Sequence, residues 1–139
     1  MSSFHLRVIA IDKVFFDGEC RQVIVTGTDG LFGIMAHHEN AVIALVEGSL
    51  QIELTDGSWL DAASGIGHVQ VIQNEVTVIL DFAEKPEEID EKRAREAMNR
   101  ATEAMQHKQS IQEFHMSQAN ISRAMARLAA KKHMRDGYQ

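Results

Sequence analysis

The chain has 139 residues, 45% of them hydrophobic, so it can build one or two packed cores and is not a disordered chain. Its net charge of −6 argues against nucleic acid as the main partner, and its single cysteine excludes an intrachain disulfide. The longest purely apolar run, residues 41–46, is far below the ~18 residues that a membrane-spanning helix needs, so we expect membrane contact only through partners.

The composition changes near residue 84. All ten valines lie at or before Val78, whereas the chain after Pro86 is rich in Ala, Met, Glu, Lys, Arg and Gln. Residues 1–83 carry three basic and eleven acidic residues, a net charge of −8, and residues 84–139 carry eleven basic and nine acidic residues, a net charge of +2. Because β-branched residues suit strands and straight side chains suit helices, we predict an α+β protein of two segregated parts, 1–84 and 85–139.

The first part consists of short, alternating apolar segments separated by turn signals. The predicted strands are Phe4–Ala10, Cys20–Thr26, Leu31–Met35, Val42–Val46, Ser49–Leu54, Ser58–Ala62, Gly65–Ile72 and Glu75–Leu80. The turn signals are Asp17-Gly18, Thr28-Asp29-Gly30, Glu47-Gly48, Asp56-Gly57 and Gln73-Asn74. Many short strands within about 80 residues predict an all-β sandwich or flattened barrel.

The second part has the period of two helices. The first is predicted to begin near Pro86, with an apolar face from Ile89 to Met105, and the second to run from Glu113 to His133 after a break at 107–112. The short connection predicts an antiparallel two-helix hairpin. Most residues on the shared face are alanines, and a buried methyl group contributes only ~0.8 kcal/mol, so we expect a weakly held, movable hairpin.

Residues typical of catalytic or metal sites do not assemble into a pattern. Gly27, Gly30 and Gly33 lack the Lys-Ser/Thr ending of a phosphate-binding loop and predict tight turns between strands. His37 and His38 are adjacent, so in an extended segment they point to opposite faces and cannot hold one metal ion together. No nucleophile–base set is present, and we predict no catalytic residues and no metal site.

Four arginines of the hairpin have a regular spacing. Arg93 and Arg100 lie two turns apart on one helix face, and Arg123 and Arg127 lie one turn apart on the other helix. An antiparallel hairpin can bring the two pairs to one place. Spacing alone favours a solvated face with ion pairs to nearby carboxylates, and an anion site is the alternative.

Taken together, the chain resembles the epsilon subunit of a bacterial F-type ATP synthase. The most specific stretch is Val25-Thr26-Gly27-Thr28-Asp29-Gly30-Leu31-Phe32-Gly33-Ile34, followed four residues later by His38. Ser64-Gly65-Ile66, residues 74–80, the length and the order of the two parts add to the resemblance. The chain departs from the family pattern around His38, where prolines are common, and at Leu31, where an acid is common.

The resemblance implies a non-catalytic subunit of the central rotor stalk. Such a subunit joins the gamma subunit to the membrane ring of c subunits, and its extended hairpin enters the alpha–beta hexamer and restrains ATP hydrolysis. It lies on the cytoplasmic face of the bacterial membrane as a peripheral protein. The positions implied for partner binding are Thr28, Asp29, Gly30, Leu31 and His38.

Some members of this family bind ATP on the folded hairpin through an Ile/Leu-Asp-x-x-Arg-Ala motif. The motif is matched in full by Ile89, Asp90, Arg93 and Ala94, and the further family positions by Glu84, Arg100, Arg123 and Arg127. The resemblance thus implies a regulatory ATP site that senses nucleotide, does not hydrolyse it and requires no other cofactor or metal. The alternatives are a free-standing adaptor that docks on another acidic protein and a hydrolase of small phosphates.

Overall fold

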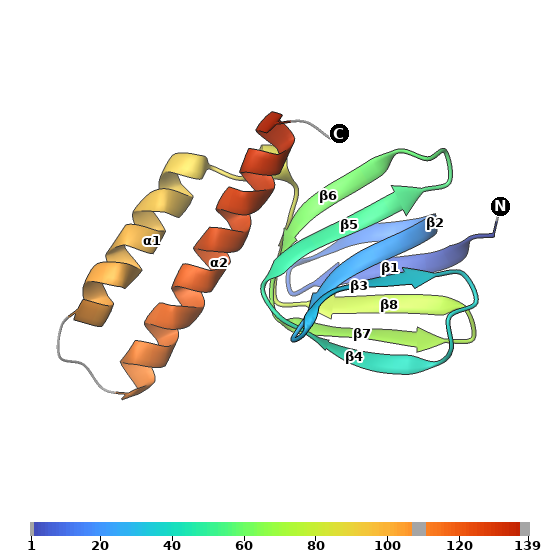
Figure 1. The fold of residues 1–139 in the computed structure, drawn as a ribbon, viewed down its shortest axis with the longest axis horizontal. Helices are drawn as coiled ribbons and strands as arrows, with labels where there is room; N and C mark the ends of the chain where they lie inside the picture. Colours follow the sequence, from blue (N-terminus) through green and yellow to red (C-terminus); the bar gives the residue numbers. More distant parts are fainter. Residues whose placement is uncertain (1, 107–110, 137–139) are drawn as a thin grey trace.

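The computed structural model describes residues 2–106 and 111–136, which form a β-sandwich followed by a pair of helices (Figure 1). In the described residues the strands are β1 (Phe4–Ala10), β2 (Lys13–Gly27), β3 (Gly30–Met35), β4 (Ala41–Leu45), β5 (Gly48–Leu54), β6 (Trp59–Ser64), β7 (Gly67–Ile72), β8 (Glu75–Leu80) and β9 (Ala83–Glu84). A single 3-10 turn, η1 (Pro86–Glu88), leads to α1 (Glu91–Gln106) and α2 (Ile111–Asp136). The fold class predicted from the sequence is confirmed.

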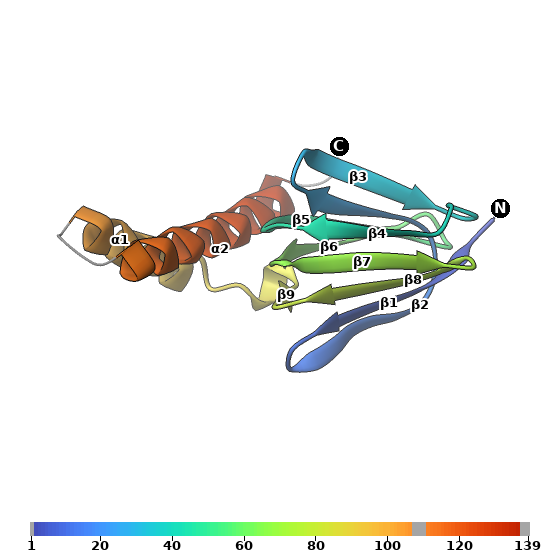
Figure 2. The ribbon, with the colours of Figure 1, turned by 90° about the horizontal axis from the view of Figure 1, so that it is seen from below.

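The strands form one sheet that folds over on itself. Its order is β1-β8-β7-β4-β2-β5-β6-β9, with β3 beside β2 and a further pairing of β1 with β2. The first half of β2 pairs with β1 and its second half pairs with β3 and β5, so this long strand connects both layers of the sandwich. Figure 2 shows the result from the side, with β3 on one outer side and the β1–β2 hairpin on the other.

The core lies between the layers and follows the two-residue period of the strands. In β1, Phe4, Leu6 and Val8 are at most 1% exposed, while the residues between them face outward or are only partly covered. Strands on the opposite layer contribute Leu50 and Ile52 at similar burial. Burying one such side chain contributes roughly 1.5–3 kcal/mol, so the sandwich is the stable part of the molecule.

The prediction of a turn at Asp17-Gly18 is wrong. Both residues lie inside β2, where Gly18 pairs with Leu6 of β1, and the chain reverses instead at Ile11-Asp12. The strand predicted to start at Cys20 accordingly starts at Lys13. Pairing with β1 overrides the local Asp-Gly preference, because a turn there would leave the edge of β1 that faces away from β8 without a partner strand.

The first helix starts later than predicted and the second is longer than predicted. Pro86 opens only the turn η1, Ile89 is extended, and α1 begins at Glu91. The prediction failed here because burying Ile89 against the sandwich requires an extended backbone. Of the predicted break at 107–112, residues 107–110 lie outside the described part, and Ile111 already belongs to α2.

The two helices are antiparallel, and α2 lies between α1 and the sandwich (Figure 1). Alanines supply much of the buried surface of the hairpin: Ala94, Ala101, Ala124, Ala126 and Ala130 are each at most 9% exposed. Small side chains allow close approach of the helices but bury little apolar area. Polar contacts therefore have a large share in holding α2 to the sandwich.

Candidate functional site

The connection between the sandwich and the hairpin is a short, partly buried segment. Ile89 is 5% exposed and packs with Ala63 of β6 and Ala130 of α2. The next residue, Asp90, caps α1, because its Oδ1 accepts a hydrogen bond from the backbone N–H of Arg93 at 3.0 Å. The segment from Ile89 to Arg93 thus fixes where α1 begins, and Asp90 has a structural role of its own.

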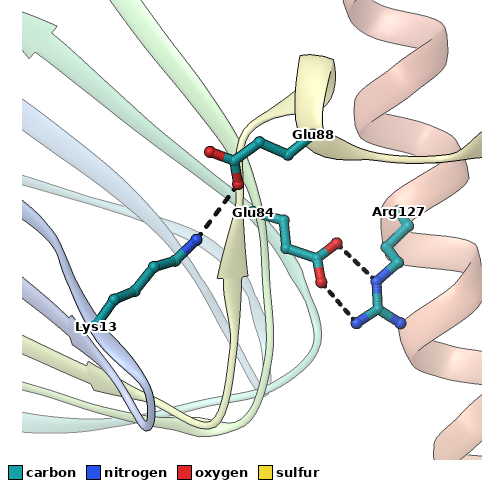
Figure 3. A network of polar contacts seen from close by, with 4 residues as sticks. All are labelled: Lys13, Glu84, Glu88 and Arg127. Atoms are coloured by element: carbon teal, nitrogen blue, oxygen red, sulfur yellow. Dashed lines mark hydrogen bonds and ion pairs between the residues drawn. The ribbon is translucent and has the colours of Figure 1, made fainter.

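Arg127 joins α2 to the last strand of the sandwich. Its Nε and Nη2 donate hydrogen bonds to the two carboxylate oxygens of Glu84 at 2.8 and 2.9 Å (Figure 3). The guanidinium also lies over the Phe82 ring, 4.5 Å from the ring centroid. Figure 3 shows a second, exposed pair close by, in which Lys13 Nζ lies 3.3 Å from Glu88 Oε2. Because a two-pronged pair has a defined direction, Glu84 orients the Arg127 guanidinium.

Two further contacts combine a nitrogen-bearing side chain of α2 with a carboxylate of the sandwich. Arg123 Nη2 lies 3.2 Å from Asp81 Oδ2, and His133 Nδ1 lies 3.1 Å from Asp61 Oδ2. The Asp61 side chain is only 5% exposed, whereas that of His133 is 45% exposed. Within the described residues, neither Asp61 oxygen receives a hydrogen bond of good geometry, so the contact with His133 is one of proximity. Arg123, Arg127 and His133 of α2 thus face three carboxylates of the sandwich.

Two adjoining hollows lie beside these pairs. The first has a volume of about 410 Å³, and its lining includes Glu84, Glu88, Ile89, Asp90, Arg93, Ala94, Arg100 and Arg127. The second has a volume of about 480 Å³, and its lining includes Ser117, Asn120, Arg100, Arg123 and Arg127. The two linings share Ala97, Arg100 and Arg127, so the hollows are neighbours. The structure thus brings all eight residues predicted for ATP binding to one place.

The two hollows differ in charge. The lining of the first combines three carboxylates with three guanidinium groups, whereas the lining of the second contains, among the described residues, three guanidinium groups and no carboxylate. Arg93 and Arg100 are exposed, and within the described residues their side chains have no ion pair or hydrogen bond. The second hollow is therefore suited to an anion with several negative charges.

The residues predicted for partner binding lie along β3. Thr28 and Asp29 form the turn between β2 and β3, and Gly30 has a φ of 119°, which a residue with a side chain rarely adopts. Leu31 is 65% exposed and borders a hollow of about 390 Å³ between α2 and the sandwich. The turn thus lies on the side of the sandwich that faces α2.

His38 lies beyond the other end of β3. Its ring is edge-on to that of Phe32, with centroids 5.8 Å apart. His37 has a φ of 63°, so the two histidines lie in a turn and not in the extended segment expected from the sequence. Met35 and Val42 are 59% and 72% exposed nearby in the sequence, which leaves apolar surface open on β3 and β4.

Several residues in or next to the site were not predicted from the sequence. Ser117 and Asn120 of α2 line the second hollow, while Asp81, just after β8, and Asp61, in β6, contact α2 from outside the two linings. The one available signal was a carboxylate in an otherwise apolar strand: Asp61 lies among Leu60, Ala62 and Ala63. A charged residue at such a position indicates a partner from elsewhere in the fold.

Two other kinds of site are not found within residues 2–106 and 111–136. No three His, Cys, Asp or Glu side chains there gather into a group that could hold a metal ion. Neither helix contains, in its described residues, a stretch long and apolar enough to span a bilayer.

Comparison with protein families gives two matches that together cover most of the chain. Residues 3–86 match the β-sandwich domain of the ATP synthase delta/epsilon chain, and residues 87–132 match the long α-helix domain of the same chain. The sequence is 40% identical over 130 residues to the ATP synthase epsilon chain of Ruminiclostridium cellulolyticum, an alignment covering 94% of this chain and 96% of that one. It is 38% identical over 137 residues to the epsilon chain of Caldicellulosiruptor saccharolyticus, covering 99% of each.

Solved structures share the fold at lower sequence identity. A chain of the Euglena gracilis mitochondrial ATP synthase, from an OSCP/F1/c-ring structure, superposes with a TM-score of 0.82 at 20% identity, covering 96% of this chain and 83% of that one. A chain of the Tetrahymena thermophila mitochondrial ATP synthase central stalk and c-ring gives a TM-score of 0.62 at 17% identity, covering 91% and 95%. Both comparisons extend over the sandwich and the hairpin.

Proposed function

The chain belongs to the epsilon-chain family of ATP synthase, and from that premise we propose that it couples the central stalk to the membrane ring and senses ATP through its folded hairpin. As an epsilon chain it is a non-catalytic subunit of the membrane-bound complex. The finer assignment concerns how it makes contact and what it binds. We propose ATP as a regulatory ligand that stabilises the docked hairpin and is not hydrolysed.

The convergence of four arginines on two neighbouring hollows carries the ATP proposal. Arg100, Arg123 and Arg127 line the second hollow, which among the described residues has no carboxylate and suits a triphosphate, and Arg93 lines the mixed hollow beside it. The apolar and acidic lining around Ile89 leaves room there for the nucleoside. Like charges gathered in this way repel one another, and a bound anion relieves that repulsion.

The free energy of ATP binding is comparable to that of the weak contacts that hold the hairpin in its docked position. A ligand present at 100 times its dissociation constant favours the bound conformation by about 2.7 kcal/mol. Each charge-assisted hydrogen bond to phosphate contributes about 1.5–3 kcal/mol. The alanine-rich interface adds little, so nucleotide binding is sufficient to shift the hairpin between docked and extended positions.

For the stalk contacts we propose the β3 side of the sandwich. The turn from Thr28 to Leu31 is assigned to the gamma subunit and c-ring, together with His38 and the exposed apolar side chains of Met35 and Val42. The extended hairpin would present the basic end of α2 to the alpha–beta hexamer and restrain ATP hydrolysis. We place the subunit on the cytoplasmic face of the membrane, held there by these partners.

Isothermal titration with ATP tests the nucleotide site. We expect wild type to bind ATP and R93A to bind at least about tenfold more weakly, since one charge-assisted bond is lost. R95A is the matched control: Arg95 lies two residues further along α1, pairs with Glu91 at 3.2 Å and is in neither lining. No wild-type binding at millimolar ATP, or equal losses in R93A and R95A, would refute the ATP site.

The rival functions are separated by two simple measurements. Co-purification with the gamma subunit supports the stalk assignment, whereas a monomer that ignores gamma supports a free-standing adaptor. Multiple turnovers of ATP by the pure protein would instead favour a hydrolase.

A further inference from the structure

A carboxylate outside the lining of the two hollows, that of Asp81, forms an ion pair with Arg123, which lines the second hollow. Asp81 follows β8, and its backbone N–H donates to the carbonyl of Ile66 at 2.9 Å. Its side chain lies against Gly65, where a Cβ atom would collide with the carboxylate. Asp81 Oδ1 is buried and receives no hydrogen bond from the part of the chain that the structure describes, while Oδ2 lies 3.2 Å from Arg123 Nη2. The position of this carboxylate is therefore set by the sandwich and not by α2.

Arg123 is held between two acceptors. Besides the contact with Asp81, its Nη1 donates a hydrogen bond to Asn120 Oδ1 at 3.4 Å. Asp81 is 26% exposed at its side chain and Arg123 is 36% exposed, so the pair is only partly screened by water. The negative charge of Asp81 thus draws the guanidinium toward the sandwich and partly neutralises one of three cations that line the second hollow.

We propose that Asp81 sets the ATP affinity of the hairpin by competing with nucleotide phosphate for Arg123. This inference rests on the proposed ATP site. A triphosphate in the second hollow brings further negative charge next to Asp81, and Arg123 must turn from the carboxylate toward the phosphates. Asp81 acts through Arg123 and is a positioning residue. It raises the ATP concentration at which the site on the docked hairpin is half occupied.

Glu84 has a different role from Asp81 although both pair with an arginine of α2. Glu84 lines the first hollow and holds Arg127 through two hydrogen bonds, so it remains part of the site when nucleotide binds. Asp81 makes a single, longer contact from outside both linings. Neutralising Asp81 therefore frees Arg123 without removing a lining residue.

The test is titration of wild type and D81N with ATP, ADP and AMP. Asparagine keeps the shape of the side chain and removes its charge. We expect D81N to bind ATP about fivefold or more tightly than wild type, ADP with a smaller gain and AMP with almost none, because the repulsion grows with phosphate charge. A purely structural change would alter all three affinities by the same factor. D81S is a second variant in case the amide disturbs the buried Oδ1 position.

D56N is the matched control, because Asp56 is an exposed carboxylate in the β5–β6 turn and its neutralisation changes the net charge equally. Unchanged or weaker ATP binding by D81N and D81S, an equal gain for all three nucleotides, or the same gain in D56N would overturn the inference. If wild type binds ATP and R93A weakens it, such a result leaves the proposed function standing. If wild type binds no ATP at millimolar concentration, the proposed ATP site is refuted and this inference falls with it.

Discussion

The buried carboxylate of Asp61, which His133 contacts near the C-terminal end of α2, allows a quantitative prediction about docking of the hairpin. Substitution H133A removes the imidazole that lies 3.1 Å from Asp61 Oδ2 and leaves a side chain that is 5% exposed beside an alanine. Leaving a buried polar group without its partner costs about 1–3 kcal/mol. The His133 side chain is 45% exposed, so water reaches this contact, and we expect about 1 kcal/mol. That corresponds to about a fivefold rise in the undocked population.

Hydrogen exchange of the α2 amides measures that population. We expect exchange about fivefold faster in H133A, with the sandwich amides unchanged. D61N removes the buried charge, so the double variant D61N/H133A is expected to return close to the wild-type rate. The reasoning is refuted if H133A exchanges like wild type, or if the double variant exchanges as fast as H133A.

Three further predictions concern the sandwich. Burial raises the pKa of Cys20 from its ordinary value of 9.0 to about 12, and the charge of Glu19 adds to the effect. Thiol reagents should therefore fail to react with Cys20 at pH 8 until the protein is unfolded. The contribution of the protonated thiol to the free energy of unfolding is present below pH 9.0 and is lost as the pH rises toward 12. G67A should lower the melting temperature because the new Cβ meets a backbone carbonyl of β8, whereas G18A, whose Cβ has ordinary contacts, should be tolerated in the same thermal scan. Hydrogen bonds from the Ser58 hydroxyl and backbone lower the pKa of Asp56. Their stabilisation of the folded state is present above the pKa that Asp56 has in the unfolded chain, and it is lost as the pH falls through the lower pKa of the folded state. A carboxyl NMR titration should show a higher pKa of Asp56 in S58A than in wild type.

The fold was predictable to the extent that side-chain periodicity decides it. The alternation in β1 and the alanine-rich spacing of the hairpin each report burial directly, so both parts were predicted in the correct order. The Asp17-Gly18 turn failed because the signal is local, whereas pairing of β1 with β2 is decided across the chain. The start of α1 failed for a related reason, since the burial of Ile89 against Ala63 and Ala130 is a tertiary contact.

The site was predictable mainly on its helical side. Arg93 and Arg100, and likewise Arg123 and Arg127, are related by helix spacing, which a sequence displays. Asp81 meets Arg123 from 42 residues away, and no periodicity connects a strand end with a helix face. The choice between a salt-bridged surface and an anion site depends on such partners, so it could not be made from spacing.

The division of charge between the two parts makes ionic strength a control on the molecule. The ion pairs of Asp81 and Glu84 with α2 are electrostatic and partly reached by water, whereas the interior of the sandwich is apolar. Dissolved ions shorten the range of charge interactions to about 10 Å at 0.1 M and about 3 Å at 1 M, and they leave hydrophobic packing intact. Concentrated salt should therefore release α2 from the sandwich under conditions in which the strands stay folded. The fraction of molecules with a docked hairpin is then larger in dilute buffer than at high ionic strength.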